Sequence, residues 1–149
     1  MQIFINVLIV IGTFFFMEGV AWFTHKYIMH GFLWSWHRSH HTVHHHALER
    51  NDLFALVFSI PSIFTISFGI DHYESFWWVL YIGLGILGYG IFYFIFHDII
   101  VHRRIKIPFK ARSKYMKRIM HAHYVHHEKH SKEGAEAFGF LYAPKKYEK

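Results

Sequence analysis

The sequence predicts an all-α fold, an integral membrane helical bundle with three to four hydrophobic spans and a histidine-rich helical cap on the cytoplasmic side. Three long apolar blocks predict the spans, because each approaches the ~20 residues that a helix needs to cross a bilayer core. A one-sided distribution of Lys and Arg predicts their orientation. Histidine clusters beside the ends of the blocks predict the cap. The 149 residues suffice for one domain, residues 1–149.

The apolar blocks are residues 1–24, 53–70 and 76–96. The second and third contain no charged residue, and the first contains only Glu18. The chain is 53% hydrophobic, and the polar residues that remain cannot cover three such blocks in a soluble fold. The first block lacks the basic start and the small-residue cleavage site of a signal peptide, so we expect it to be retained as a span.

Positive charge predicts the topology. Every Lys and Arg lies within 25–52 or 97–149, and none lies in the 71–75 turn between the second and third blocks. Because Lys and Arg stay on the cytoplasmic side, these two spans should form a hairpin whose turn is outside. This topology brings both histidine regions to the cytoplasmic face. No nucleic-acid recognition motif accompanies the net charge of +6, so nucleic acid is not an expected partner.

Ten of the sixteen histidines repeat one order, a pair followed by a triplet, twice along the chain. Each pair has four intervening residues, and each triplet reads H-x-x-H-H. The ten are His25, His30, His37, His40, His41, His97, His102, His123, His126 and His127. Neutral imidazole binds iron, zinc, copper and nickel, and ten rings suit two ions better than one. The order therefore predicts a dinuclear, all-histidine metal centre, and with it redox or hydrolytic chemistry.

The spacing also indicates how the rings converge. Positions i, i+3 and i+4 share one face of an α-helix, so each triplet can aim its rings at one place. Within a pair, five residues rotate the chain by about 140° from the starting direction. Either the helix is disturbed there, or the two rings approach the site from opposite sides. A lone histidine on an apolar face is usually a packed core residue, but ten in a repeated order are not explained in this way.

Two assignments remain open from spacing alone. His44, His45 and His46 extend the second cluster, and counting from His41 also gives H-x-x-H-H. Glu18, inside the first span, either hydrogen-bonds a ligand histidine and fixes its tautomer or simply lies near the wet end of the span.

Neighbouring residues have weaker signals. Asp98 adjoins His97 but should point to a different side of a helix. The tryptophans Trp22, Trp34 and Trp36 either line a substrate channel or belong to an interfacial aromatic belt.

Five stretches of the chain resemble bacterial β-carotene hydroxylases, a family within the fatty acid hydroxylase and sterol desaturase superfamily. They are HKYIMHG (25–31), WHRSHH (36–41), NDLFALVF (51–58), FHDIIVHRR (96–104) and AHYVHHEKHSKEGAEAFGFLYAP (122–144). The histidine boxes are shared across the superfamily. NDLFALVF and SKEGAEAFGFLYAP narrow the resemblance to the carotenoid branch, and the resemblance covers nearly the whole chain.

The resemblance implies a non-haem diiron centre that uses O2 and reducing equivalents from a ferredoxin-type electron donor. It implies hydroxylation of β-carotene and related carotenoids at C3 of the β-ionone ring, through β-cryptoxanthin to zeaxanthin. It favours the WHRSHH register, with His37, His40 and His41 as ligands. No catalytic side chain beyond the metal centre is implied. The expected location is the lipid bilayer of the bacterial inner membrane, and zinc can replace iron on purification.

Two alternatives remain. The boxes also permit another membrane hydroxylase, desaturase or ketolase that acts on fatty acyl, sterol or carotenoid substrates. A metal or haem transporter is the alternative outside the enzymes. A transporter holds its ligands near the middle of the membrane and haem needs one or two axial ligands, whereas ten histidines here gather at one face.

Overall fold

The computed structural model describes residues 1–42 and 48–148, and all regular secondary structure in these ranges is helical. Three helices are long and apolar enough to cross a membrane, Gln2–Phe32, Arg50–Asp71 and Tyr73–Val101. Large apolar side chains along them face outward, with Phe16 69% and Phe64 67% exposed. Such surfaces suit lipid and not water. The protein is a membrane helical bundle with three spans, as the sequence predicts.

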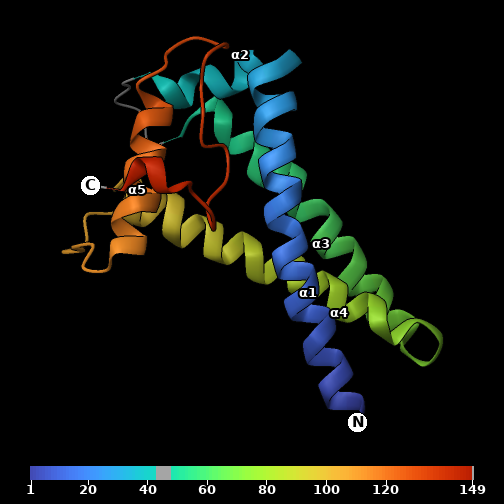
Figure 1. Ribbon diagram of the computed structural model, residues 1–149. Helices are drawn as coiled ribbons and strands as arrows, with labels where there is room; N and C mark the ends of the chain where they lie inside the picture. Colours follow the sequence, from blue (N-terminus) through green and yellow to red (C-terminus); the bar gives the residue numbers. More distant parts are fainter. Residues whose placement is uncertain (43–47, 149) are drawn as a thin grey trace.

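The first and third spans each change helix type near one end. The first is α1 (Gln2–Phe23) followed by the π-helix η1 (Thr24–Phe32), and the third is α4 (Tyr73–Tyr93) followed by the π-helix η4 (Phe94–Val101). The second span begins with the 3₁₀ turn η3 (Arg50–Asp52) and continues as α3 (Leu53–Asp71). Helices α3 and α4 form a hairpin, and α4 also packs along α1 (Figure 1).

Glycines allow these close packings. A Cβ atom on Gly83 would lie 2.6 Å from Ile66 Cγ1 of α3, and one on Gly85 would lie 2.6 Å from Thr13 Cβ of α1. The approach is close enough for Ser62 Oγ to donate a hydrogen bond to the Gly83 carbonyl oxygen, at 3.1 Å. In lipid, where packing replaces the hydrophobic effect, small residues stabilise helix pairs in this way.

The cap lies at the end of the bundle opposite the hairpin turn. It consists of α2 (Trp34–His37), the 3₁₀ turn η2 (Arg38–His41), α5 (Lys114–His127) and the short η5 (Lys145–Tyr147). Between α5 and η5, residues 128–144 form an extended segment, here named the C-terminal strap. The strap folds back from α5 across the upper end of α1 (Figure 1).

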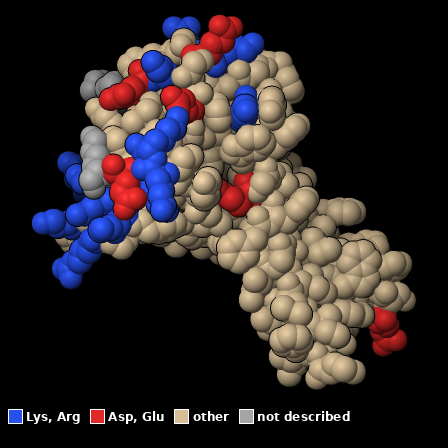
Figure 2. Space-filling view, in the orientation of Figure 1, with Lys and Arg blue, Asp and Glu red and all other residues tan. Residues whose placement is uncertain are grey.

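Charge is divided between the two ends of the molecule. Figure 2 shows Lys and Arg gathered over the cap and none over the projecting end of the α3–α4 hairpin. The charged residues around that turn are Asp71 and Glu74. This is the asymmetry from which the sequence predicts orientation.

Candidate metal centre

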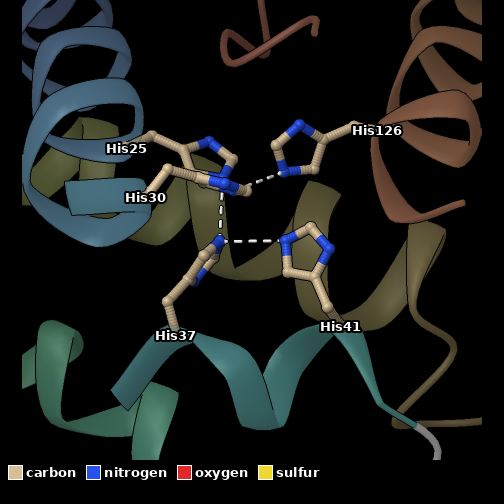
Figure 3. Close-up of side chains that lie close together, drawn as sticks. All are labelled: His25, His30, His37, His41 and His126. Carbon is tan, nitrogen blue, oxygen red and sulfur yellow. Dashed lines mark hydrogen bonds between the residues drawn. The ribbon is translucent and has the colours of Figure 1, made fainter. Parts of the chain in front are cut away.

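The ten predicted histidines lie together, and they form two groups of five. The first pentad consists of His25, His30, His37, His41 and His126, and the second of His40, His97, His102, His123 and His127. In each pentad, one nitrogen from every ring lies within 4.8 Å of the other four. Figure 3 shows the rings of the first pentad pointing toward one another from η1, from the α2–η2 segment and from α5.

The pentads are interleaved. Each takes four rings from one half of the chain and one ring from the other half. The outer two histidines of each triplet join the pair of their own half, while the middle one, His40 or His126, crosses to the other pentad. On α5, His123 and His127 are about 40° apart in projection, whereas His126 is about 100° from His127. The two triplets of the sequence repeat thus exchange their middle rings between the two pentads.

The two histidine pairs lie on the π-helical turns that end the first and third spans. A π-helix closes i→i+5 hydrogen bonds, and the backbone N–H of His102 donates to the carbonyl of His97 at 2.9 Å. The wider turn brings residues five apart closer to one face than an α-helix would. The ring centroids of His25 and His30 are 5.3 Å apart, and those of His97 and His102 are 4.4 Å apart. Of the two alternatives, the disturbed helix is therefore the correct one.

Burial keeps these rings neutral. It lowers the pKa of His37 to about 2, that of His126 to about 3, and those of His41 and His102 to about 4. His126 has no exposed surface. Neutral imidazole is the form that binds metal ions, so the rings are ready to act as ligands at neutral pH.

In the first pentad, the outer nitrogens are held by neutral oxygens. Four rings donate their Nδ1–H groups to carbonyl oxygens of the C-terminal strap. These are His25 to Phe138 (2.9 Å), His30 to Lys132 (3.1 Å), His41 to Lys129 (2.8 Å) and His126 to Glu136 (2.7 Å). The fifth, His37 Nδ1, lies 2.7 Å from Asn51 Oδ1. Because these oxygens accept the Nδ1 proton, each ring carries a lone pair on Nε2.

These lone pairs converge. His25 Nε2 lies 3.0 Å from His37 Nε2, and His30 Nε2 lies 3.3 Å from His126 Nε2 (dashed lines, Figure 3). With the protons on Nδ1, no hydrogen remains between the facing nitrogens, and two unshielded lone pairs at such distances repel. A cation between the rings removes this repulsion. The donor set of the first pentad therefore fits a metal ion.

The second pentad shows the same convergence with different surroundings. His40 Nε2 lies 2.9 Å from His97 Nε2, while their Nδ1 atoms each lie 3.1 Å from a carboxylate, that of Glu49 and of Asp98 respectively. Arg104 forms ion pairs with both of these carboxylates. Carboxylates that accept from ligand histidines fix the tautomer and raise the basicity of the ring. This donor set also fits a metal ion.

One further atom supports the same conclusion. His127 Nε2 is buried without a hydrogen-bond partner among residues 1–42 and 48–148. Buried polar atoms normally find a partner, and His127 Nε2 belongs to a ring within the second pentad.

The structure places several residues near the predicted ligands, and one prediction among them was wrong. Asp98 does not point away from the site, because its carboxylate reaches the ring of the adjacent His97 on the π-helical turn. The hydrogen bonds of Glu18 go to a tyrosine and to the backbone of the strap, and not to a histidine. His44, His45 and His46 lie outside the described residues. His72 lies at the hairpin turn between α3 and α4 and belongs to neither pentad.

Sequence reasoning missed Glu49, Asn51 and Arg104. Asn51 and Arg104 belong to two of the stretches that carry the family resemblance, NDLFALVF and FHDIIVHRR. These stretches marked a functional region without assigning a role to either side chain. Glu49 had no spacing signal.

An apolar cavity of about 470 Å³ adjoins the pentads between α1, α3 and α4. Its wall includes His25 and His97 at one end and mostly apolar side chains elsewhere, among them Met17, Phe58, Ile63, Leu87 and Phe140.

Of the two roles left open for the tryptophans, the structure does not support the channel role, because Trp22, Trp34 and Trp36 are absent from the described lining of this cavity. Trp34 packs on the ring of His30, with centroids 5.0 Å apart, and Trp36 packs on Phe54 at 5.7 Å. Trp22 borders a separate hollow beside the strap.

Comparison with known proteins identifies the family. The chain is 45% identical over 141 residues to the β-carotene hydroxylase of Pseudescherichia vulneris, which covers 95% of this chain and 78% of the relative. It is 46% identical over 139 residues to that of Pantoea ananas, covering 93% and 78%. A Paracoccus enzyme of the same name is 42% identical over 140 residues, covering 93% and 85%. The chain belongs to the β-carotene hydroxylase family.

This membership confirms the resemblance found in the sequence, and it makes the protein an oxidoreductase. No family model and no solved structure matches the chain. The geometry of the two pentads therefore comes from this structure alone.

Proposed function

We propose that this protein hydroxylates β-carotene at C3 of the β-ionone ring, forming zeaxanthin through β-cryptoxanthin. The reaction uses O2, external electrons and two iron ions, one held by each pentad, within a single domain of residues 1–149. The observation that carries the proposal is the pair of converging imidazole pentads beside an apolar cavity between membrane spans. The names of the relatives, β-carotene hydroxylases, support the substrate.

The chain's own residues would bind and orient. Bound iron would supply the activation of O2, which side chains cannot perform. The neutral rings leave the positive charge of the ions uncompensated, which favours binding of the anions formed when O2 is reduced. The strap, with its Phe138 ring, and the ring of Trp34 cover the first pentad and exclude water from it. The ring centroid of Phe138 lies 5.4 Å from that of His25. No acid or base is needed at a C–H bond, so the proposal assigns no catalytic side chain beyond the metal centre.

The cavity suits a hydrocarbon. β-Carotene has no polar group, so its recognition depends on shape and apolar contact. Along the second span the lining extends from Asn51 to Ile63, and along the third span from Ile86 to Asp98, which is about 18 Å of helix in each case. A substrate in this cavity would lie along the spans with one ring beside the pentads.

The proposed location is the bacterial inner membrane, with the metal centre on the cytoplasmic side. The support is the gathering of Lys and Arg on the cap (Figure 2). A basic cap also suits an acidic electron donor such as a ferredoxin.

Expression in a bacterial host that accumulates β-carotene tests the proposal. Pigment analysis should show zeaxanthin and a singly hydroxylated intermediate, and isotopically labelled O2 should place its oxygen in the new hydroxyl group. Label that arrives from water would exclude the oxygenase reaction. Unchanged β-carotene together with hydroxylated lipid or sterol would support the proposed hydroxylation but show that the proposed substrate is wrong.

A further inference from the structure

Glu18 is a half-buried carboxylate inside a membrane span, and it joins three parts of the chain. Its Oε1 accepts hydrogen bonds from the backbone N–H groups of Phe140, at 2.6 Å, and Leu141, at 2.8 Å. Its Oε2 accepts one from the hydroxyl of the buried Tyr89, at 2.7 Å. An ionisable group within a span is costly and usually has a function. Here the carboxylate links α1, α4 and the C-terminal strap.

The strap is shaped around this carboxylate. A Cβ atom on Gly139 would lie 2.8 Å from Glu18 Oε1, so the residue before the two N–H donors leaves room for the carboxylate. Two residues earlier, Ala137 has a φ of 59°, a left-handed conformation that a non-glycine residue adopts at a cost in energy. Such a conformation persists only where the surrounding contacts enforce it.

The same part of the strap holds the first pentad. The carbonyl oxygens on either side of Ala137 accept from two ligand rings, that of Glu136 from His126 at 2.7 Å and that of Phe138 from His25 at 2.9 Å. The unusual turn at Ala137 therefore presents both carbonyls to the pentad. By contrast, the second pentad meets the strap through the ring of Phe140, whose centroid lies 5.0 Å from that of the His97 ring and 5.1 Å from that of the His123 ring.

We propose that Glu18 is a positioning residue that latches the strap to the spans. Through the strap it fixes the Nδ1–H tautomer and the orientation of the first-pentad rings. This inference rests on the proposed function in so far as the first pentad holds a metal ion. The latch itself, a contact between Glu18 and the strap, does not depend on that assignment.

The test uses the full-length protein in lipid nanodiscs and two measurements. Trypsin cleavage after Lys132 reports whether the strap is held, and titration of the metal-free protein with Fe(II) reports the affinity of each site. In Glu18→Ala, cleavage should be at least about tenfold faster. One of two sites should lose about 10- to 100-fold in affinity, the range found when a partner of a ligand histidine is removed. Glu18→Gln, which keeps an acceptor oxygen for both strap N–H groups, should restore most of each loss.

Three variants separate latching from general damage. Gly139→Ala places a methyl group against the carboxylate without altering a span, so it should release the strap as Glu18→Ala does. Tyr89→Phe keeps both strap hydrogen bonds and should have the smaller effect. Glu74→Ala, an acidic residue near the hairpin turn, is the matched control and should change neither measurement.

Unchanged cleavage and unchanged Fe(II) affinities in both Glu18→Ala and Gly139→Ala would overturn the latch. Equal weakening of both sites in Gly139→Ala would overturn its selectivity for the first pentad. If the unaltered protein binds fewer than two ions, the proposed function fails, while trypsin cleavage still decides whether Glu18 holds the strap.

Discussion

The two pentads are built from the same histidine order, yet they are supported differently. In the first, four rings donate to carbonyl oxygens of a loop that arrives from the far end of the chain. In the second, His40 and His97 face carboxylates that Arg104 gathers at the ends of spans. The comparison teaches that equivalent sets of rings can have different surroundings, and that the groups behind the rings set how basic and how rigid each site is.

The largest expected effect is the loss of hydroxylation when one ring is removed, and it should be the same for both pentads. His126→Ala removes a ring from the first and His40→Ala removes one from the second, and each should reduce hydroxylation at least about 100-fold, beyond the cost of altering only a partner of a ligand. The same holds for the other eight histidines. Product analysis in the β-carotene-accumulating host measures this. Near-normal activity in either variant would remove that pentad from the centre, and His72→Ala, at the hairpin turn, should retain full activity.

Asp98→Asn should weaken the second pentad alone. The amide keeps the size of the side chain but removes the negative charge beside His97, so Fe(II) affinity at one site should fall about tenfold. Titration of the metal-free protein measures both sites. A fall at both sites, or at neither, would mean that the carboxylates do not distinguish the pentads.

Asn51→Asp makes the converse change, because it places a carboxylate behind His37 in the first pentad. The environments of the two ions should then become more alike. In Mössbauer spectra of the iron-loaded protein, two distinct signals are expected for the unaltered chain and a smaller separation for the variant. A single signal in the unaltered protein would show that the different surroundings have no electronic consequence.

The smallest expected effect is the loss of stability of the metal-free protein at low pH. It should be similar for the two pentads. Burial lowers the pKa of His41 in the first and of His102 in the second to about 4, against about 6.5 when unfolded. Between these values the unfolded chain binds more protons, so the stability of the metal-free protein falls as pH decreases from about 6.5 to 4. The thermal unfolding midpoint should drop by at least about 5 °C between pH 7 and pH 5. An unchanged or higher midpoint at pH 5 would contradict this.

The sequence predicts what is local in the chain. The spans follow from long apolar blocks, and the ten histidines follow from their repeated spacing. The five-residue spacing of each pair left two possibilities, a disturbed helix or two rings that approach the site from opposite sides. The π-helical hydrogen bond from the His102 N–H to the His97 carbonyl decides for the disturbed helix.

Features that depend on distant contacts could not be predicted. Glu49 meets Arg104 across 55 positions of the chain, and Glu18 meets Phe140 across 122. No periodicity connects residues so far apart. The exchange of His40 and His126 between pentads likewise depends on how the α2–η2 segment and α5 face each other, which spacing within either segment does not determine.

That exchange has a consequence for the order of events when the protein is made. A chain grows from its N-terminus, and α5 (Lys114–His127) is the last helix to contribute a ring to either pentad. The first pentad waits for His126, and the second waits for His123 and His127. An unfinished chain that ends before α5 can present up to seven of the ten rings but completes neither set. Neither pentad can therefore be completed before α5 has been made, and both become complete within the same few residues, from His123 to His127.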